Sequence, residues 1–115
     1  MSVYSQGFKG YEEAEDIHGQ IRLAKAKNID SLHLHNMNFN FACYYDDAQA
    51  NEVKKLLDKN GIKVLSLFIK DDVPAERAKS LAGIYQAKFL VTATEGKKKE
   101  LEKEITDIEI FNEGE

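Results

Sequence analysis

The chain has 115 residues, 43% of them apolar and 31% charged, and its net charge is −4. This length is typical of one domain, and the mixed charges are typical of a globular chain and not a disordered one. The acidic balance disfavours non-specific binding of DNA or RNA. The longest apolar run is too short to span a bilayer. With no secretion signal at its start and Cys43 as its one cysteine, the chain is expected to be cytoplasmic.

We predict a single domain over 1–115, with 1–10 as a loose arm and 112–115 as a solvated tail. The first predicted helix covers 11–28, because apolar residues recur there at helical spacing. These are Ala14, Ile17, Ile21 and Ala24.

The apolar period changes to two from Ile29 onward. Apolar residues occupy even positions up to Leu34 and odd positions from Met37. In one continuous strand this change would move the apolar side chains to the other face. We therefore predict two adjacent strands within 31–45, joined by a turn or a bulge near Asn36. Their polar face is expected to meet water or a partner, and a homo-oligomer is predicted through this strand pair or through the aromatic arm.

Helices and strands then alternate three times. A helix is predicted after Asp46 and Asp47, up to Asn60, a second after Asp72, which we expect to be its N-cap, and a third over 95–104. Strands are predicted at 62–70, 88–94 and 106–112. Such alternation favours an α/β fold with a mixed, mostly parallel sheet of four to six strands and about four helices. The alternative is a ferredoxin-like βαββαβ core with a C-terminal extension, in which the arm is the first strand.

The stretch SLHLH places His33 and His35 on one face of a predicted strand, where both imidazoles would reach one metal ion. Over these five residues it resembles the histidine pair of the first strand in metal-dependent hydrolases of the amidohydrolase and PHP kinds. Such sites use further histidines downstream, and none follows His35. We therefore predict no metal there. Cys43 falls on the apolar side of its strand, and we expect a buried thiol.

Acidic residues follow the predicted strands, where parallel sheets bind ligands. The alternative catalytic set is Asp46, Asp47, Asp71 and Asp72, which would hold Mg²⁺ for phosphoryl transfer or phosphodiester cleavage. Each of these acids also precedes a predicted helix, and aspartate is a preferred N-cap residue. Helix capping therefore explains them without a ligand.

The stretch TATEGKKKE puts lysines at the start of a helix, where the dipole disfavours cations. A bound anion would remove this conflict. The predicted ligand-binding residues are Thr92, Thr94, Gly96, Lys97 and Lys98. The competing interpretation is a solvated run of lysines that pair with nearby glutamates.

Taken together, these features predict a small non-enzymatic binding or regulatory protein that acts as a homo-oligomer. Its expected ligand is an anionic small molecule such as a nucleotide. The alternative is a divalent-metal-dependent phosphoryl-transfer or phosphodiesterase enzyme. No catalytic triad, zinc ligand set or nucleotide-binding fingerprint is present in the sequence, which favours the first hypothesis.

Overall fold

The computed structural model describes residues 12–14, 16–37 and 40–112. Within them the helices are α1 Ile17–Ala26, α2 Asp47–Lys59, α3 Ala75–Tyr85 and α4 Glu95–Glu104. The strands are β1 Ser31–Leu34, β2 Asn36–Met37, β3 Asn40–Phe41, β4 Lys63–Ile69, β5 Phe89–Thr92 and β6 Glu109–Asn112. A 3₁₀ turn, η3 Ala42–Tyr44, precedes α2. None of the helices in these ranges combines the length and apolar character needed to cross a membrane.

Four strands form one parallel sheet in the order β1-β4-β5-β6, and β2 and β3 form a small antiparallel pair. The predicted α/β fold with a mostly parallel sheet is thereby confirmed. The ferredoxin-like alternative is wrong for these four strands, since that core has an antiparallel sheet. The arm that it required as a first strand lies outside the described residues.

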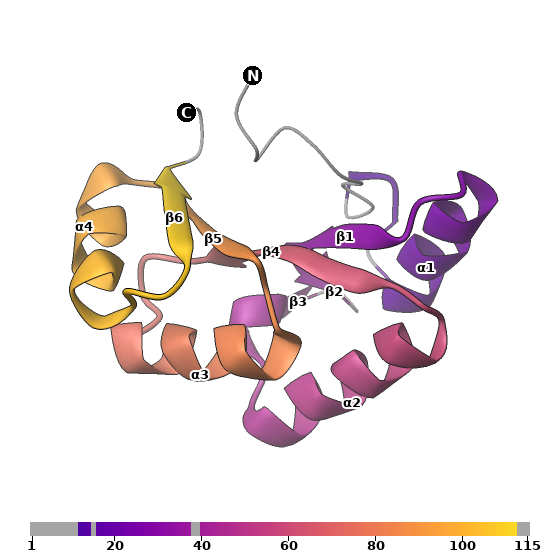
Figure 1. The fold of residues 1–115 in the computed structure, drawn as a ribbon, viewed down its shortest axis with the longest axis horizontal. Coiled ribbons are helices and arrows are strands. Elements are labelled where there is room, and N and C mark those ends of the chain that lie inside the picture. Colours follow the sequence, from indigo (N-terminus) through magenta and orange to yellow (C-terminus); the bar gives the residue numbers. More distant parts are fainter. Residues whose placement is uncertain (1–11, 15, 38–39, 113–115) are drawn as a thin grey trace.

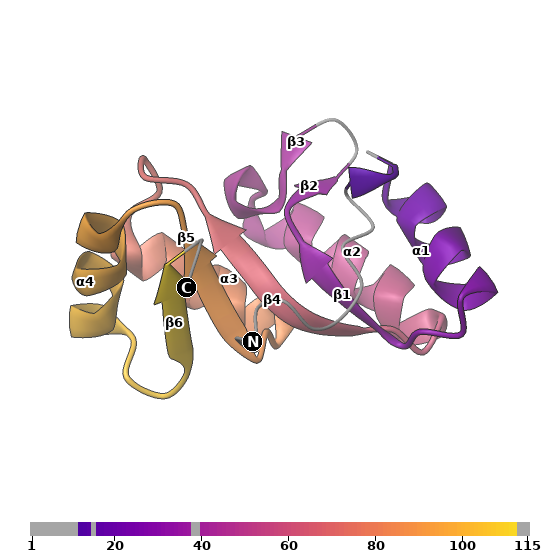
Figure 2. The ribbon, with the colours of Figure 1, turned by 90° about the horizontal axis from the view of Figure 1, so that it is seen from above.

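The order of the strands explains where the helices lie. The chain moves across the sheet in one direction, from β1 through β4 and β5 to β6. Right-handed crossovers in a constant direction place every connecting helix on the same face. Figure 1 accordingly shows α2 and α3 below the sheet, with α1 beside β1 and α4 beside β6. Figure 2 looks onto the sheet, with α2 and α3 behind the strands.

The main core fills the space between the helices and this face of the sheet. Fully buried leucines from the strands meet fully buried side chains from the helices there: Leu32, Leu34, Leu67 and Leu90 on the strands, and Leu57, Leu81, Tyr85 and Leu101 on the helices. Burial of a leucine contributes about 1.5–3 kcal/mol to stability. This core is therefore the main source of stability in the described part of the chain.

An irregularity in the pairing of β1 with β4 changes the phase of β4. Leu32 pairs with Val64, but the next residue, His33, pairs with Ser66. The extra residue is Leu65, so Val64 and Leu67 both face the main core although they are three residues apart. The prediction that this strand is apolar on both faces is confirmed, because Leu67 and Phe68 are both buried.

Two helix boundaries differ from the predictions. Helix α1 begins at Ile17, because the Asp16 carboxylate caps it by accepting hydrogen bonds from the amides of His18 and Gly19 at 2.7 and 3.3 Å. The prediction that Asp72 caps α3 is wrong. Pro74 holds the N-cap position of α3 in an extended conformation.

The interval 31–45 also folds differently from the prediction. β1 pairs with β4 and not with the strand that follows it, so the two predicted neighbouring strands belong to different sheets. Cys43 lies in the 3₁₀ turn η3 and not in a strand. The interpretations of 1–10 as a loose arm and of the last residues as a tail fall on residues 1–11 and 113–115, which lie outside the described ranges.

Candidate functional site

The carboxyl ends of β4 and β5 lie side by side, and mostly polar residues follow them. There the segment after β4 and the 3₁₀ turn η3 line a depression of about 230 Å³. Its lining residues are Tyr44, Lys70, Asp71, Asp72 and Ala93. Open parallel sheets bind ligands at this edge. The depression is therefore the candidate site, which we call the carboxyl-edge site.

Two aspartates of this site accept hydrogen bonds from neutral hydroxyl groups. The Tyr44 hydroxyl donates to Asp72 Oδ1 at 2.7 Å, and the Thr94 hydroxyl donates to Asp71 Oδ1 at 3.3 Å. The hydrogen bond to Asp72 raises the pKa of Tyr44 to about 12, because ionisation would set a phenolate beside the carboxylate. Both aspartates remain exposed to solvent and therefore keep acceptor capacity for a ligand.

The charges in the carboxyl-edge site do not cancel. Lys70 is its one cation, and the Lys70 ammonium lies 4.6 Å from the centroid of the Phe41 ring. Within the described ranges, neither Asp71 nor Asp72 forms an ion pair. Tyr44 beside them is 41% exposed and is the one exposed large hydrophobic residue in those ranges. The site therefore presents two carboxylates and an aromatic ring to solvent.

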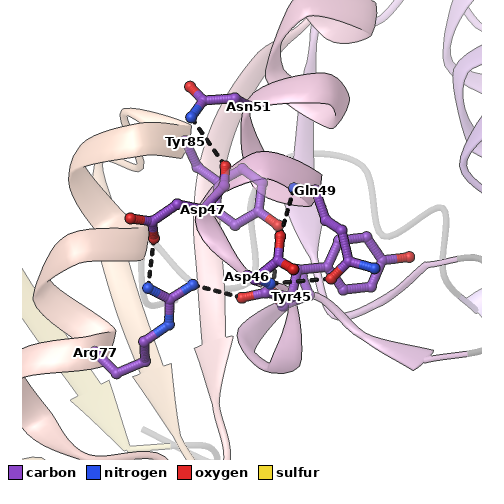
Figure 3. Close-up of polar contacts among 8 residues, drawn as sticks. Tyr45, Asp46, Asp47, Gln49, Asn51, Arg77 and Tyr85 are labelled. Atoms are coloured by element: carbon purple, nitrogen blue, oxygen red, sulfur yellow. Dashed lines mark hydrogen bonds and ion pairs between the residues drawn. The ribbon is translucent and has the colours of Figure 1, made fainter.

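The other two predicted acids lie at the start of α2 (Figure 3). Asp46 is the N-cap and forms a capping box with Gln49, with hydrogen bonds of 2.8 and 3.0 Å. Asp47 forms an ion pair with Arg77, and the same guanidinium donates to the Tyr45 carbonyl at 2.7 Å. The structure thus divides the four predicted acids into two pairs. Among the residues it describes, no three histidine, cysteine, aspartate or glutamate side chains form a group that could hold a metal ion.

The predicted anion-binding residues do not converge on one point. Thr94 caps α4 by accepting from the Lys97 amide at 3.2 Å. The Lys97 side chain is 5% exposed, and its ammonium donates to the Val73 carbonyl at 2.5 Å and to Glu100 at 2.7 Å. Thr92 is buried and donates to the Thr94 carbonyl at 3.0 Å. The polar groups of Lys97 and Thr92 are thus engaged within the protein.

The two remaining residues of this prediction lie apart from those groups. Lys98 lines a different depression of about 490 Å³ beside α4 and β6, together with Glu102 and Glu109. A Cβ atom at Gly96 would meet nothing within 4 Å, so local packing does not require glycine there. These five residues are close in the sequence, but their polar groups do not face one common site.

The histidines lie on the sheet face opposite the main core. Their alternation with Leu32 and Leu34 predicted that both point away from the main core. The prediction that this face is exposed to water is wrong for His33, which is 1% exposed. His33 Nδ1 and Ser66 Oγ share a hydrogen bond of 2.5 Å, and His33 also meets Phe89 edge-on. His35 stacks on Phe68 with the ring centroids 4.3 Å apart.

Sequence reasoning missed Tyr44, Lys70 and Ser66. Ser66 carries a usable signal, since a single hydroxyl inside the apolar run VLSLFI needs a partner when it is buried. Tyr44 and Lys70 carry none, because the site depends on the contact of η3 with the end of β4. The expectation of a buried thiol at Cys43 is confirmed, and burial raises its pKa.

The candidate site is thus defined by geometry and charge within this chain. Its elements are a depression at the carboxyl edge of a parallel sheet, two carboxylates held by hydroxyl donors, and an exposed tyrosine ring. Comparisons of the chain with protein-family models, with curated protein sequences and with solved structures found no match.

Proposed function

We propose that the protein is a small non-enzymatic binding protein whose ligand occupies the carboxyl-edge site. One observation carries the proposal. The depression lies where open parallel sheets bind ligands, and its two carboxylates have hydroxyl partners but no cationic partner within the described residues. A ligand that supplies a positive charge would complete this arrangement.

The chemistry of the lining residues selects the class of ligand. Carboxylates form charge-assisted hydrogen bonds with ammonium and guanidinium groups, and an aromatic ring adds a cation–π contribution of about 0.5–1 kcal/mol at an exposed site. Asp71, Asp72 and Tyr44 offer both kinds of contact. We therefore propose a small organic cation, such as an amine, as the ligand.

The anionic ligand predicted from the sequence stays a prediction, with less support at this edge. An anion beside Thr94 would approach the Asp71 carboxylate, which lies 3.3 Å from the Thr94 hydroxyl. The Lys97 ammonium, which was expected to attract the anion, is buried against Val73 and Glu100. The Mg²⁺-dependent enzyme likewise stays a prediction, with less support, because Asp46 caps α2 and Asp47 is paired with Arg77.

The homo-oligomer also remains a prediction. Tyr44 is the one large hydrophobic side chain exposed in the described ranges, so an assembly through those ranges would use polar contacts or a strand edge. Light scattering over a wide concentration range tests it. A constant mass of 13.0 kDa would identify a monomer, and multiples of this mass would establish an oligomer.

A thermal-shift panel tests the proposed ligand class. The probes are putrescine, inorganic phosphate, adenosine monophosphate and Mg²⁺, each added to the unaltered protein. A ligand that binds the folded state raises the melting temperature by mass action. We expect putrescine to raise it and phosphate to leave it unchanged, with an affinity weaker than about 1 μM because the carboxylates are exposed.

Variants locate the effect at the carboxyl-edge site. The double variant Asp71→Asn/Asp72→Asn removes both charges while keeping acceptor oxygens for the hydroxyl donors. Asp30→Asn is the matched control, since Asp30 is an exposed acid at the opposite end of the sheet, just before β1. The putrescine response should vanish in the double variant and persist in the control. A response to phosphate or to Mg²⁺ alone, lost in the same double variant, would refute the proposed ligand class.

A further inference from the structure

The turn that follows β4 presents both aspartates of the carboxyl-edge site. The Val73 amide donates to the Lys70 carbonyl at 3.1 Å, which closes a turn over 70–73. Asp71 and Asp72 occupy its two central positions, and both are exposed to solvent. Because Lys70 opens the same turn, one positive and two negative side chains leave the backbone at three successive positions.

The Lys70 ammonium lies against an aromatic ring. It is 4.6 Å from the centroid of the Phe41 ring, within the distance of about 6 Å at which a ring face attracts a cation. Within the described ranges Lys70 forms no ion pair with either neighbouring aspartate. The Phe41 ring in turn meets the Tyr44 ring edge-on, with the centroids 5.7 Å apart. The protein therefore holds a cation of its own on a ring that adjoins the carboxyl-edge site.

This ammonium sets the net charge of the site. The lining residues include two carboxylates and one ammonium, and Tyr44 adds no charge at pH 7 because its pKa is raised to about 12. The site is therefore singly negative although it holds two acids. One positive charge on a ligand neutralises it, whereas a second positive charge would meet the Lys70 ammonium, and like charges repel.

We propose that Lys70 determines which cations the carboxyl-edge site prefers. With its ammonium in place the site takes a ligand through a single positive charge, and without that charge it favours a ligand with two. The role of Lys70 rests on the proposed binding of amines at this site. Its charge opposes a second ammonium of the ligand, and its contact occupies the Phe41 ring that a second ammonium would need. A diamine therefore binds the unaltered protein through one ammonium, and its other ammonium stays in water.

Paired titrations with butylamine and putrescine test this preference. The two ligands have the same carbon chain and carry one and two ammonium groups at pH 7. Their affinities are read from the amide resonances of 70–72. In the unaltered protein we expect the affinities to agree within about threefold, since only one ammonium is held. In Lys70→Gln, which loses the charge, we expect the ratio of putrescine affinity to butylamine affinity to rise at least about threefold.

Two further variants separate charge from position. Lys70→Arg keeps a positive charge that also stacks on an aromatic ring, so the ratio of affinities should stay at its unaltered value. Lys63→Gln is the matched control, because Lys63 is exposed at the other end of β4, about 20 Å along the strand. This distance exceeds the screening length of about 8 Å at physiological salt. The control should therefore leave the ratio unchanged.

A measurement without ligand tests the position of the ammonium. The ring current of Phe41 should move the ε-methylene resonances of Lys70 upfield, and Phe41→Leu should remove this shift. Unshifted resonances in the unaltered protein would place the ammonium away from the ring and would overturn the proposal.

The titrations distinguish a failure of Lys70 from a failure of the binding function. If both amines bind at 70–72 but the ratio is the same in Lys70→Gln, the role of Lys70 is overturned and the proposed function stands. If neither amine binds the unaltered protein or the folded Lys70→Gln variant, both are overturned. If Lys70→Gln does not fold, the unaltered protein decides, and a putrescine affinity more than about tenfold above that of butylamine would overturn the proposal.

Discussion

The two faces of the parallel sheet reach similar burial by different means. On one face the connecting helices contribute leucines, alanines and Tyr85 to a continuous core. On the other face a smaller cluster of Phe68, Phe89 and Val91 lies under no described helix. The difference follows from the strand order β1-β4-β5-β6, because crossovers in one direction place all connecting helices together. The second face is left without a helical layer in the described part of the chain.

Neighbouring residues of β5 offer the sharpest comparison of the two faces. Leu90 points to the helices and Val91 to the opposite face of the sheet, and their exposed fractions are 0% and 1%. We expect Leu90→Ala to lower the free energy of unfolding by about 2–5 kcal/mol, since it leaves a cavity in the main core. We expect Val91→Ala to lower it by about 1–3 kcal/mol, because fewer buried carbons are removed.

Urea denaturation of both variants measures these losses. The matched control is Ala93→Gly, at an exposed position just beyond the end of the same strand. A Val91→Ala variant as stable as the unaltered protein would mean that the cluster of Phe68, Phe89 and Val91 is open to water in solution. The two faces would then differ in whether solvent reaches them, and not in the size of their apolar clusters.

A buried hydrogen bond between His33 and Ser66 lies on the sheet face opposite the helices, beside Phe89. Its 2.5 Å length joins two side chains that are 1% and 2% exposed. We expect Ser66→Ala to cost about 1–3 kcal/mol of stability, because it removes a buried partner of the imidazole. Ser80→Ala, on the exposed surface of α3, should change stability by less than about 0.5 kcal/mol. Equal stability of both variants by urea denaturation would contradict a structural role for this bond.

The four predicted acids divide into Asp46 and Asp47 at the start of α2 and Asp71 and Asp72 in the carboxyl-edge site. Asp46→Ala breaks the capping box of α2 and should cost about 0.5–2 kcal/mol, whereas Asp46→Asn should retain most of the stability. Asp71 and Asp72 cap no helix. We therefore expect Asp71→Ala and Asp72→Ala each to cost less than about 0.5 kcal/mol. Thermal melts that rank Asp71→Ala below Asp46→Ala in stability would reverse this division.

Much of the fold was predictable because the residues that mark the ends of helices and the apolar pattern of the strands agreed with the observed elements and their burial. Asp46 before α2 and Asn60-Gly61 after it marked that helix to within a residue, and Gly61 has the positive φ of 70° that a helix end favours. The run from Lys63 to Ile69 was apolar on both faces, as a central parallel strand requires.

Other features depended on contacts that the sequence does not encode locally. The period change near Asn36 was correctly placed, but whether β1 would pair with β2 or with β4 was decided by packing across the sheet. Lys97 looked like a surface cation, yet its ammonium reaches the Val73 carbonyl at the start of α3. Asp71 and Asp72 were predicted as acids beyond a strand end, but the contact of Asp72 with Tyr44 was not, since these two residues are 28 residues apart in the chain.

The Tyr44–Asp72 hydrogen bond makes a prediction about pH. It raises the pKa of Tyr44 to about 12, from an ordinary value of about 10. A raised folded-state pKa means that its stabilising contribution is complete below pH 10 and is lost as the pH rises from 10 to 12. In Asp72→Asn we expect the pKa of Tyr44 to fall toward 10, as followed by the Cζ resonance of labelled tyrosine. An unchanged pKa would show that Asp72 is not its cause, and Asp71→Asn serves as the neighbouring control.

The most direct test of the account is to map a small amine onto the folded protein. Amide resonances of the isotopically labelled chain are followed during titration with putrescine, and separately with inorganic phosphate. We expect putrescine to shift the amides of 70–72 and 93–94, and we expect Asp71→Asn/Asp72→Asn to abolish these shifts. Phosphate should produce no shifts there. Phosphate-induced shifts at 94–98, with no response to putrescine at 70–72, would contradict the proposed cationic ligand and would favour an anionic one.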